Sequence, residues 1–229
     1  MIKIRPSVER GAAKLDWLDS RHSFSFDQYY DPAHMGFRSL RVINEDRVAA
    51  GMGFGMHPHK DMEILTWILQ GALTHRDNMG HAETIRPGEL QHMTAGTGVV
   101  HSEMNPSKDQ PVHLLQIWIE PGRRGLKPEY EQLFFQSGDL QGKFALLAGP
   151  EGPVTIHQDV NLYATRLVPG ETARMKLQPG RYGWLQLAAG EIELNGNKIE
   201  AGDGAAISDE GAIICQAAEK SEALLFDLA

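Results

Sequence analysis

The sequence predicts an all-β protein, and two observations carry that prediction. Its 229 residues include 24 glycines and 12 prolines, which recur as turn pairs such as Pro87-Gly88 and Pro169-Gly170. Between these pairs lie short runs rich in Ile, Leu, Val and Trp, such as Glu63–Leu69 and Val112–Ile119. Short apolar runs separated by turn residues are typical of antiparallel sandwiches and barrels. Helix is expected to be sparse, with room for one or two turns at Pro128–Gln136.

A weak internal repeat indicates that the β unit is duplicated. The run from Trp67 to Gly71 resembles the run from Trp184 to Gly190, and each is followed by a second glycine turn and another strand-like run. Repeated supersecondary units of this kind predict two similar halves. The turn-rich stretch Gln136–Gly152 separates them, so we expect one barrel in residues 1–140 and another in residues 141–229.

Composition excludes several classes of protein. Hydrophobic content of 41% and charged content of 23% are ordinary for a globular chain. The net charge of −8 argues against a nucleic-acid-binding surface. Cys215 is the only cysteine, which excludes an internal disulfide and a CxxC zinc site. No run approaches the roughly 18 apolar residues of a membrane span, and the N-terminal segment lacks the apolar core of a signal peptide, so we expect a cytoplasmic protein.

The positions of the histidines indicate that the functional site lies in the first half of the chain. Seven of the ten lie between positions 57 and 113, among them His57-Pro-His59 and His101-Ser-Glu103. Residues i and i+2 of a strand point to the same face, so each pair presents two ligands to one side. Two such strands supply three imidazoles and one carboxylate, a set that suits iron, nickel, copper, zinc, cobalt or manganese. On a six-coordinate ion, two positions would stay open.

The identity of the carboxylate ligand is open at this point. Glu63 shares the strand parity of His57 and His59, and it competes with Glu103. We favour Glu103, because the His-x-Glu spacing keeps it beside His101. Four other histidines are interpreted as surface residues or hydrogen-bonded core residues, and they are His75, His81, His92 and His113.

Longer motifs resemble a known family. The spacing from Gly51 through His57, His59 and Glu63 matches the first cupin motif, and Gly98 to Asn105 matches the end of the second. Together with these motifs, several further stretches resemble the pirin family, namely Ser23–Phe26, Tyr29–Pro32, Met35–Phe37, Leu40–Asn44 and Met93–Gly98. The resemblance covers the whole chain and is most specific over residues 57–103. Gly71 comes one residue later than the generic pattern, and Gly96 replaces a proline.

The resemblance implies a fold and a site. It implies two cupin-type (jelly-roll) β-barrels in one chain, with one metal in the N-terminal barrel and none in the C-terminal barrel. Carried over by motif, the ligands are His57, His59, His101 and Glu103, with Glu103 also the catalytic base. We expect one divalent transition metal, with Fe(II) favoured over Zn, Co, Ni, Cu and Mn.

The resemblance also implies an activity. The expected function is a quercetin 2,3-dioxygenase, which cleaves the heterocyclic ring of a flavonol with dioxygen and releases carbon monoxide. The alternatives are a regulatory, partner-binding protein that uses the metal as a redox sensor and a metal-dependent isomerase or hydrolase. A monomer without direct contact to nucleic acid or membrane is expected. An apolar pocket for a flat aromatic substrate would draw on Phe24, Phe26, Met52, Phe54, Met56, Trp67, Met93 and Trp118.

Overall fold

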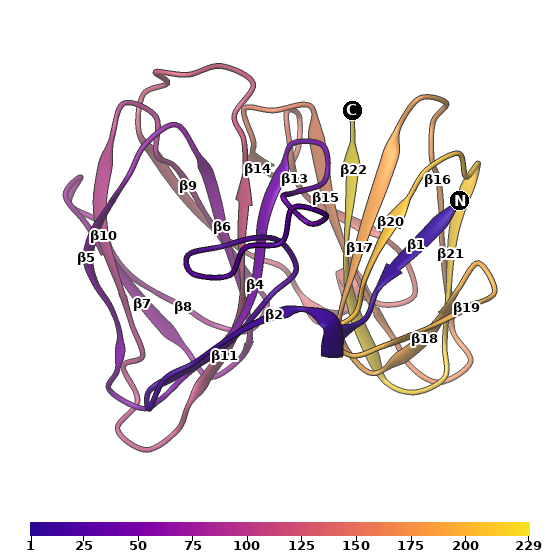
Figure 1. The fold of residues 1–229 in the computed structure, drawn as a ribbon, viewed down its shortest axis with the longest axis horizontal. Helices are drawn as coiled ribbons and strands as arrows, with labels where there is room; N and C mark the ends of the chain where they lie inside the picture. The colour runs from indigo at the N-terminus through magenta and orange to yellow at the C-terminus, as the bar shows by residue number, and fades with distance from the viewer.

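The computed structural model describes all of residues 1–229, and it forms two β-barrels that lie side by side (Figure 1). In the first barrel, a seven-stranded sheet of order β12-β9-β6-β11-β4-β3-β2 faces a four-stranded sheet of order β5-β10-β7-β8. The strands of this barrel are β2 (Gly11–Lys14), β3 (Leu18–His22), β4 (Leu40–Val48), β5 (Gly53–His59), β6 (Glu63–Gln70), β7 (Leu73–Asp77), β8 (Ala82–Ile85), β9 (Glu89–Thr94), β10 (Val99–Met104), β11 (Val112–Ile119) and β12 (Glu129–Phe134).

The second barrel has the same plan. Its sheets have the orders β1-β20-β17-β22-β15-β13-β14 and β16-β21-β18-β19. Its strands are β1 (Ile2–Arg5), β13 (Ala145–Gly149), β14 (Val154–Thr155), β15 (Val160–Leu167), β16 (Thr172–Lys176), β17 (Tyr182–Ala189), β18 (Glu191–Leu194), β19 (Asn197–Glu200), β20 (Gly204–Ile207), β21 (Ala212–Ala217) and β22 (Ser221–Leu228). The fold is therefore all-β with two cupin barrels, as the sequence predicts.

The two strand orders correspond one for one. Strand β6 sits between β9 and β11 as β17 sits between β20 and β22, so the repeated segments around Trp67 and Trp184 occupy equivalent places. Strand β1 is the exception to a division along the chain. It pairs with β20 from Ile2↔Ile207 to Arg5↔Gly204, so the first residues of the chain complete the second barrel (Figure 1). The division of the remaining chain near residue 140 stays a prediction.

The helix expected at Pro128–Gln136 is wrong. These residues form β12, which pairs with β9 from Glu129↔Thr94 to Phe134↔Glu89. The edge of β9 supplies hydrogen-bond partners that outweigh a weak local helix preference. Helix is confined to a 3-10 turn, η1 (Ser7–Glu9), and a single turn of α-helix, α1 (Ser137–Leu140). Neither helix has the length or the apolar character of a membrane span.

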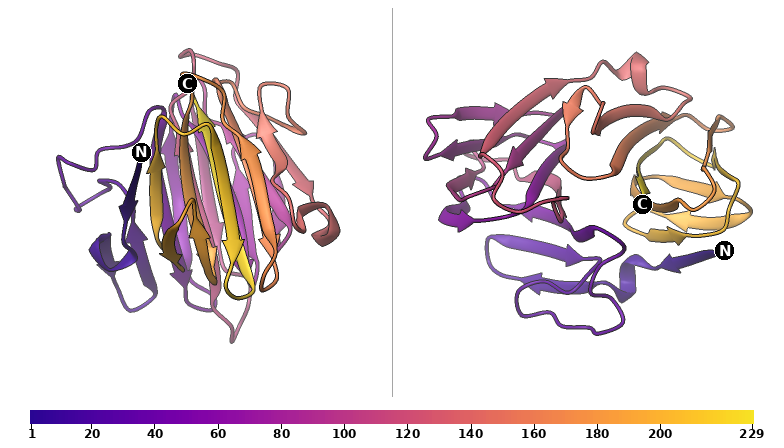
Figure 2. Two further views of the ribbon diagram at one scale, coloured as in Figure 1. Left: turned by 90° about the vertical axis from the view of Figure 1, so that its right-hand side faces the viewer. Right: turned by 90° about the horizontal axis from the view of Figure 1, so that it is seen from above.

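The large sheets of the two barrels pack face to face (Figure 2, left). A cluster of 22 buried residues joins them, with Trp67 and Leu115 from the first barrel against Leu162 and Phe226 from the second. Alternate residues of each strand point into the barrel instead. The chain thus has three apolar layers, of which two lie inside the barrels and one lies between them.

Candidate metal centre

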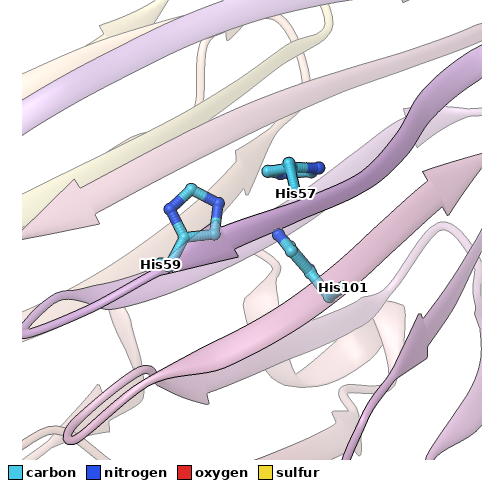
Figure 3. Close-up of side chains that lie close together, drawn as sticks. All are labelled: His57, His59 and His101. Atoms are coloured by element: carbon cyan, nitrogen blue, oxygen red, sulfur yellow. The ribbon is translucent and has the colours of Figure 1, made fainter.

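Three histidines converge inside the first barrel. His57 and His59 lie on β5, His101 lies on the neighbouring strand β10, and His101 stands opposite His57 in the register. Figure 3 shows the three rings facing one another across the two strands. The ring centroids are 4.4 Å apart for His57 and His101, and 4.8 Å apart for both other pairs. One ligand nitrogen of each ring lies within 4.8 Å of the others.

The environment keeps the rings of His59 and His101 neutral. Burial, followed by the charges of His57 and His59, lowers the pKa of His101 to about 2. Burial, followed by His57, lowers the pKa of His59 to about 4. A neutral imidazole keeps the lone pair that a metal ion needs, so the cluster is ready to bind a cation at neutral pH.

Two glycines allow the strands to reach this arrangement. Gly96, in the turn before β10, has φ +46°, and a Cβ there would lie 2.1 Å from the Leu126 carbonyl oxygen. Gly53 lies within β5, where a Cβ would lie 2.2 Å from the Glu103 carbonyl oxygen. Gly96 before His101 therefore serves the turn, whereas Gly53 permits close approach of the two strands.

Glu103 is a buried neighbour of the cluster. A β-bulge separates it from His101, since His101 pairs with His57 but Glu103 pairs with Phe54. Burial, followed by the charge of Asp46, raises the pKa of Glu103 to about 7. Its ligand oxygen lies within 4.8 Å of ligand nitrogens of His101 and His75, a second group that shares His101 with the three-histidine cluster.

Glu63 faces away from the cluster of His57, His59 and His101. It begins β6, and its carboxylate accepts hydrogen bonds from His92 Nε2 at 2.6 Å and from Thr94 Oγ1 at 3.0 Å. Its same-parity neighbours Leu65 and Trp67 belong to the layer between the barrels. The parity argument for Glu63 fails because the chain turns between β5 and β6, with Asp61 at φ +49°, and the two strands belong to different sheets.

A cavity of about 590 Å³ adjoins the cluster, with His57, His59 and Glu103 in its wall. Aromatic side chains surround it. Trp17 packs edge-on against Phe54 at 5.3 Å, and Trp118 lies 4.9 Å from His59. Of the eight pocket residues expected from the sequence, three line this cavity, namely Phe26, Phe54 and Trp118.

The other five point elsewhere. Phe24 and Trp67 lie in the layer between the barrels, and Met93 packs in a small core beside Ile64. Met52 and Met56 are exposed. A hydrophobic residue type alone does not reveal which face of a strand it occupies, and this explains the errors.

Sequence reasoning missed the polar wall of the cavity. Ser20 and His22 on β3 and Asn44 and Asp46 on β4 are all buried lining residues. Ser20 Oγ donates to Asp46, and His22 Nδ1 lies 2.8 Å from Asn44 Oδ1. The available signal was i, i+2 spacing of polar residues within otherwise apolar strands.

The remaining histidines have separate roles. His92 binds Glu63, and His113 Nε2 lies 2.8 Å from Glu45 Oε1, which matches their interpretation as hydrogen-bonded residues. His75 has the same interpretation from the sequence and is fully buried, but it also contacts the cluster: its Nδ1 lies 3.3 Å from His101 Nδ1.

In the second barrel, the strands that correspond to β5 and β10 carry no histidines. There β16 pairs with β21, and Cys215 stands opposite Ala173. Cys215 is buried among apolar side chains, and burial raises the pKa of its thiol to about 12. Both groupings of potential metal ligands lie in the first barrel.

The donor atoms of the histidine cluster fit a divalent transition metal. His101 Nε2 is buried and has no hydrogen-bond partner in the protein. His57 Nδ1 donates to the Gly55 carbonyl oxygen at 2.7 Å, which leaves its Nε2 free. A buried polar atom without a partner costs free energy, and a cation between the three rings would remove that cost.

The fold and site thus define a bicupin whose first barrel holds a cluster of histidines that could bind a metal ion. A protein-family model described as Pirin matches residues 4–119, and a second family model, described as the quercetinase C-terminal cupin domain, matches residues 146–228. The chain belongs to the pirin family.

Similar proteins are known from Escherichia coli. A quercetin 2,3-dioxygenase of strain K12 is 49% identical over 230 residues, covering 100% of this chain and 99% of that protein. The crystal structure of YhhW from Escherichia coli has a TM-score of 0.95 at 47% identity and covers 100% of this chain and 98% of its own. The bacterial pirin YhhW in complex with nickel(II) has a TM-score of 0.94 at 48% identity, covering 100% and 99%.

Proposed function

We propose that this protein is a metal-dependent dioxygenase that cleaves the heterocyclic ring of a flavonol such as quercetin with dioxygen and releases carbon monoxide. The observation that carries the proposal is the convergence of three imidazoles, two of them in the wall of an aromatic-lined cavity. The full-length similarity to a protein named quercetin 2,3-dioxygenase supports the choice of substrate. The match to a quercetinase C-terminal cupin domain supports it as well.

We propose His57, His59, His101 and Glu103 as the metal ligands, with the metal in the first barrel (residues 1–140) and none in the second (residues 141–229). The ion is proposed to be Fe(II), and the nickel(II) complex of the Escherichia coli pirin supports a divalent metal in general. Such an ion supplies Lewis acidity toward the 3-hydroxyl and 4-carbonyl oxygens of the flavonol and redox chemistry toward dioxygen.

The protein residues bind and orient the substrate. The side chains of Trp17 and Phe54 offer an apolar surface for the flat rings, and they keep bulk water from the reacting carbon atoms. Asp46 and Asn44, also in the wall of the cavity, offer acceptors for the phenolic hydroxyl groups. A polyhydroxylated aromatic molecule matches both kinds of wall.

Glu103 is the base in this proposal. Its pKa of about 7 lies near neutral pH, where a carboxylate removes a proton with the best balance of ionisation and basicity. Taking the proton of the 3-hydroxyl makes the adjacent ring electron-rich and open to attack by dioxygen. The Gln116 amide, 3.5 Å from Glu103 Oε1, helps to orient the carboxylate.

The test is an oxygen-electrode assay on protein loaded anaerobically with Fe(II), with quercetin as substrate and carbon monoxide trapped by reduced haem protein. We expect oxygen uptake matched by carbon monoxide release, and a loss of about 10²- to 10⁴-fold in kcat in Glu103→Gln, the usual contribution of a general base. His157→Ala serves as control, because His157 lies at the surface, paired with Glu129. Metal-loaded protein that takes up no oxygen with any flavonol would contradict the proposal.

A further inference from the structure

A chain of buried hydrogen bonds leads away from the histidine cluster. His101 Nδ1 lies 3.3 Å from His75 Nδ1, and His75 Nε2 lies 3.1 Å from Asp77 Oδ2. The side chains of His75 and Asp77 are entirely buried. Both residues lie on β7, and its pairing with β10 sets His75 opposite Glu103 and Asp77 opposite His101. The chain is therefore built into the register of two neighbouring strands.

The donors around Asp77 set the direction of each hydrogen bond. Asp77 Oδ1 accepts the backbone N–H groups of Met79 at 2.9 Å and His81 at 3.0 Å. Asp77 Oδ2 faces His75 Nε2 and, at 2.8 Å, His81 Nδ1. Four donors around one carboxylate hold it ionised, and an ionised carboxylate only accepts. The proton of neutral His75 consequently resides on Nε2, and its Nδ1 carries a lone pair.

The next hydrogen bond then has one possible direction. Because His75 Nδ1 is an acceptor, His101 Nδ1 is the donor. A neutral His101 with its proton on Nδ1 has a lone pair on Nε2, the atom that is buried without a partner in the protein. The ring of Tyr130 packs against His75, with centroids 4.9 Å apart, and holds it in place.

We propose that His75 and Asp77 are positioning residues that fix the tautomer of His101, so that its Nε2 is always available to a divalent transition metal. The inference rests on the metal centre of the proposed function. It assigns a role to two residues that do not touch the ion. Partners of this kind hold a ligand ring in orientation, and their loss typically lowers metal affinity by about 10- to 100-fold.

Two substitutions at position 77 separate this role from a structural one. In Asp77→Asn the side-chain oxygen is retained by the two backbone N–H groups, so the amide nitrogen must face His75. His75 then becomes protonated on Nδ1, His101 on Nε2, and the ligand lone pair is lost. Asp77→Ala leaves both rings free to choose a tautomer. If Asp77 were only structural, Asp77→Ala would lower the metal affinity more than Asp77→Asn, because asparagine preserves the turn at Met79 and alanine does not.

The experiment has two readouts on the full-length protein. Long-range ¹H–¹⁵N correlation spectra of metal-free protein report which nitrogen of His101 carries the proton. Calorimetric titration with nickel(II) reports affinity and stoichiometry. We expect an Nδ1–H tautomer in the wild type and Nε2–H in Asp77→Asn, with nickel affinity lowered about 10- to 100-fold, and a smaller loss in Asp77→Ala. His113→Gln, which replaces a histidine that faces a carboxylate outside this hydrogen-bond chain, serves as control and keeps the wild-type affinity.

Three results would overturn the inference. They are an unchanged His101 tautomer in Asp77→Asn, a larger loss of affinity in Asp77→Ala than in Asp77→Asn, and two nickel ions per chain. The last would mean that His75, His101 and Glu103 hold an ion of their own. A wild type that binds no nickel removes the metal centre as well, whereas a failure to turn over quercetin affects only the proposed activity. The two proposals therefore fail in distinguishable ways.

Discussion

Fifteen buried apolar side chains fill the second barrel. In the first barrel, two smaller apolar clusters, of seven and three residues, leave room for a polar belt that includes Thr66, Gln116 and Glu103. Buried polar groups cost free energy unless they are paired, and beside the belt His101 Nε2 and Trp118 Nε1 have no hydrogen-bond partner in the protein. The two barrels therefore differ in role. The second barrel contributes stability, whereas the first is less stable because its interior holds a binding site.

The largest effect is expected from removal of a metal ligand in the first barrel. His59→Ala should lower metal affinity more than about 100-fold, beyond the usual effect of residues that only support a ligand. Its free energy of unfolding without metal should stay near the wild-type value or rise, because a desolvated imidazole is removed. Metal analysis and urea unfolding of the metal-free protein check the two statements. Full metal content in His59→Ala would remove the chemical difference between the barrels.

The second largest effect is expected from truncation in the packed barrel. Leu225→Ala opens a void in a fully buried cluster and should lower the free energy of unfolding by about 2–5 kcal/mol. Leu114→Ala in the first barrel only enlarges a cavity that exists, so its cost should fall toward the lower end of that range. Urea unfolding of both variants checks the difference, and equal costs would mean that the barrels are packed alike.

The sequence shows where the chemistry lies better than it shows the details of the site. The i, i+2 spacing of His57 and His59 survives in the structure because strand parity is a local property. The position of Glu63 depends on which sheet β6 joins, and that is decided by pairing with distant strands. Strand β1 is a similar case, since its partner β20 lies about 200 residues away along the chain and no local sequence pattern predicts this pairing.

His75 and Asp77 illustrate the same limit. Their His-x-Asp spacing was visible, yet it acquires meaning only when β7 pairs with β10 and brings them beside His101. The polar wall at Ser20 and Asp46 likewise needs two strands in register. Residue spacing predicts a shared face, whereas tertiary pairing decides what that face meets.

Asp46→Asn tests how much stability the first barrel loses by burying a carboxyl group in the polar wall of its cavity. Burial raises the pKa of Asp46 to about 6, above its ordinary value of 3.8, although the Ser20 hydroxyl opposes the shift. A carboxyl group with a raised pKa in the folded state binds its proton more tightly there than in the unfolded chain. Its contribution to stability is therefore present at acid pH and is lost as the pH rises from about 4 to about 6.

Asparagine removes this loss while keeping an acceptor for Ser20. We expect Asp46→Asn to raise the free energy of unfolding by about 3 kcal/mol at pH 8, at roughly 1.4 kcal/mol per pKa unit, and to change it little at pH 4. Urea unfolding at the two pH values measures this. A variant that is equally destabilised at both would show that Asp46 pays no desolvation cost in the native barrel.

The smallest effect is expected at the contact between the barrels. Trp67 Nε1 of the first barrel donates to Glu222 Oε1 of the second at 2.7 Å, and Arg166 pairs with the other oxygen of Glu222 at 2.8 Å. Trp67→Phe removes the first hydrogen bond but leaves the carboxylate paired, so the loss should be about 1 kcal/mol plus a small packing term. Because the 22-residue layer still joins the barrels, both should unfold in one transition, monitored by circular dichroism of the whole chain and by nickel release from the first barrel. Separate transitions would mean that this one hydrogen bond, rather than the apolar layer, couples the stable barrel to the barrel that carries the site.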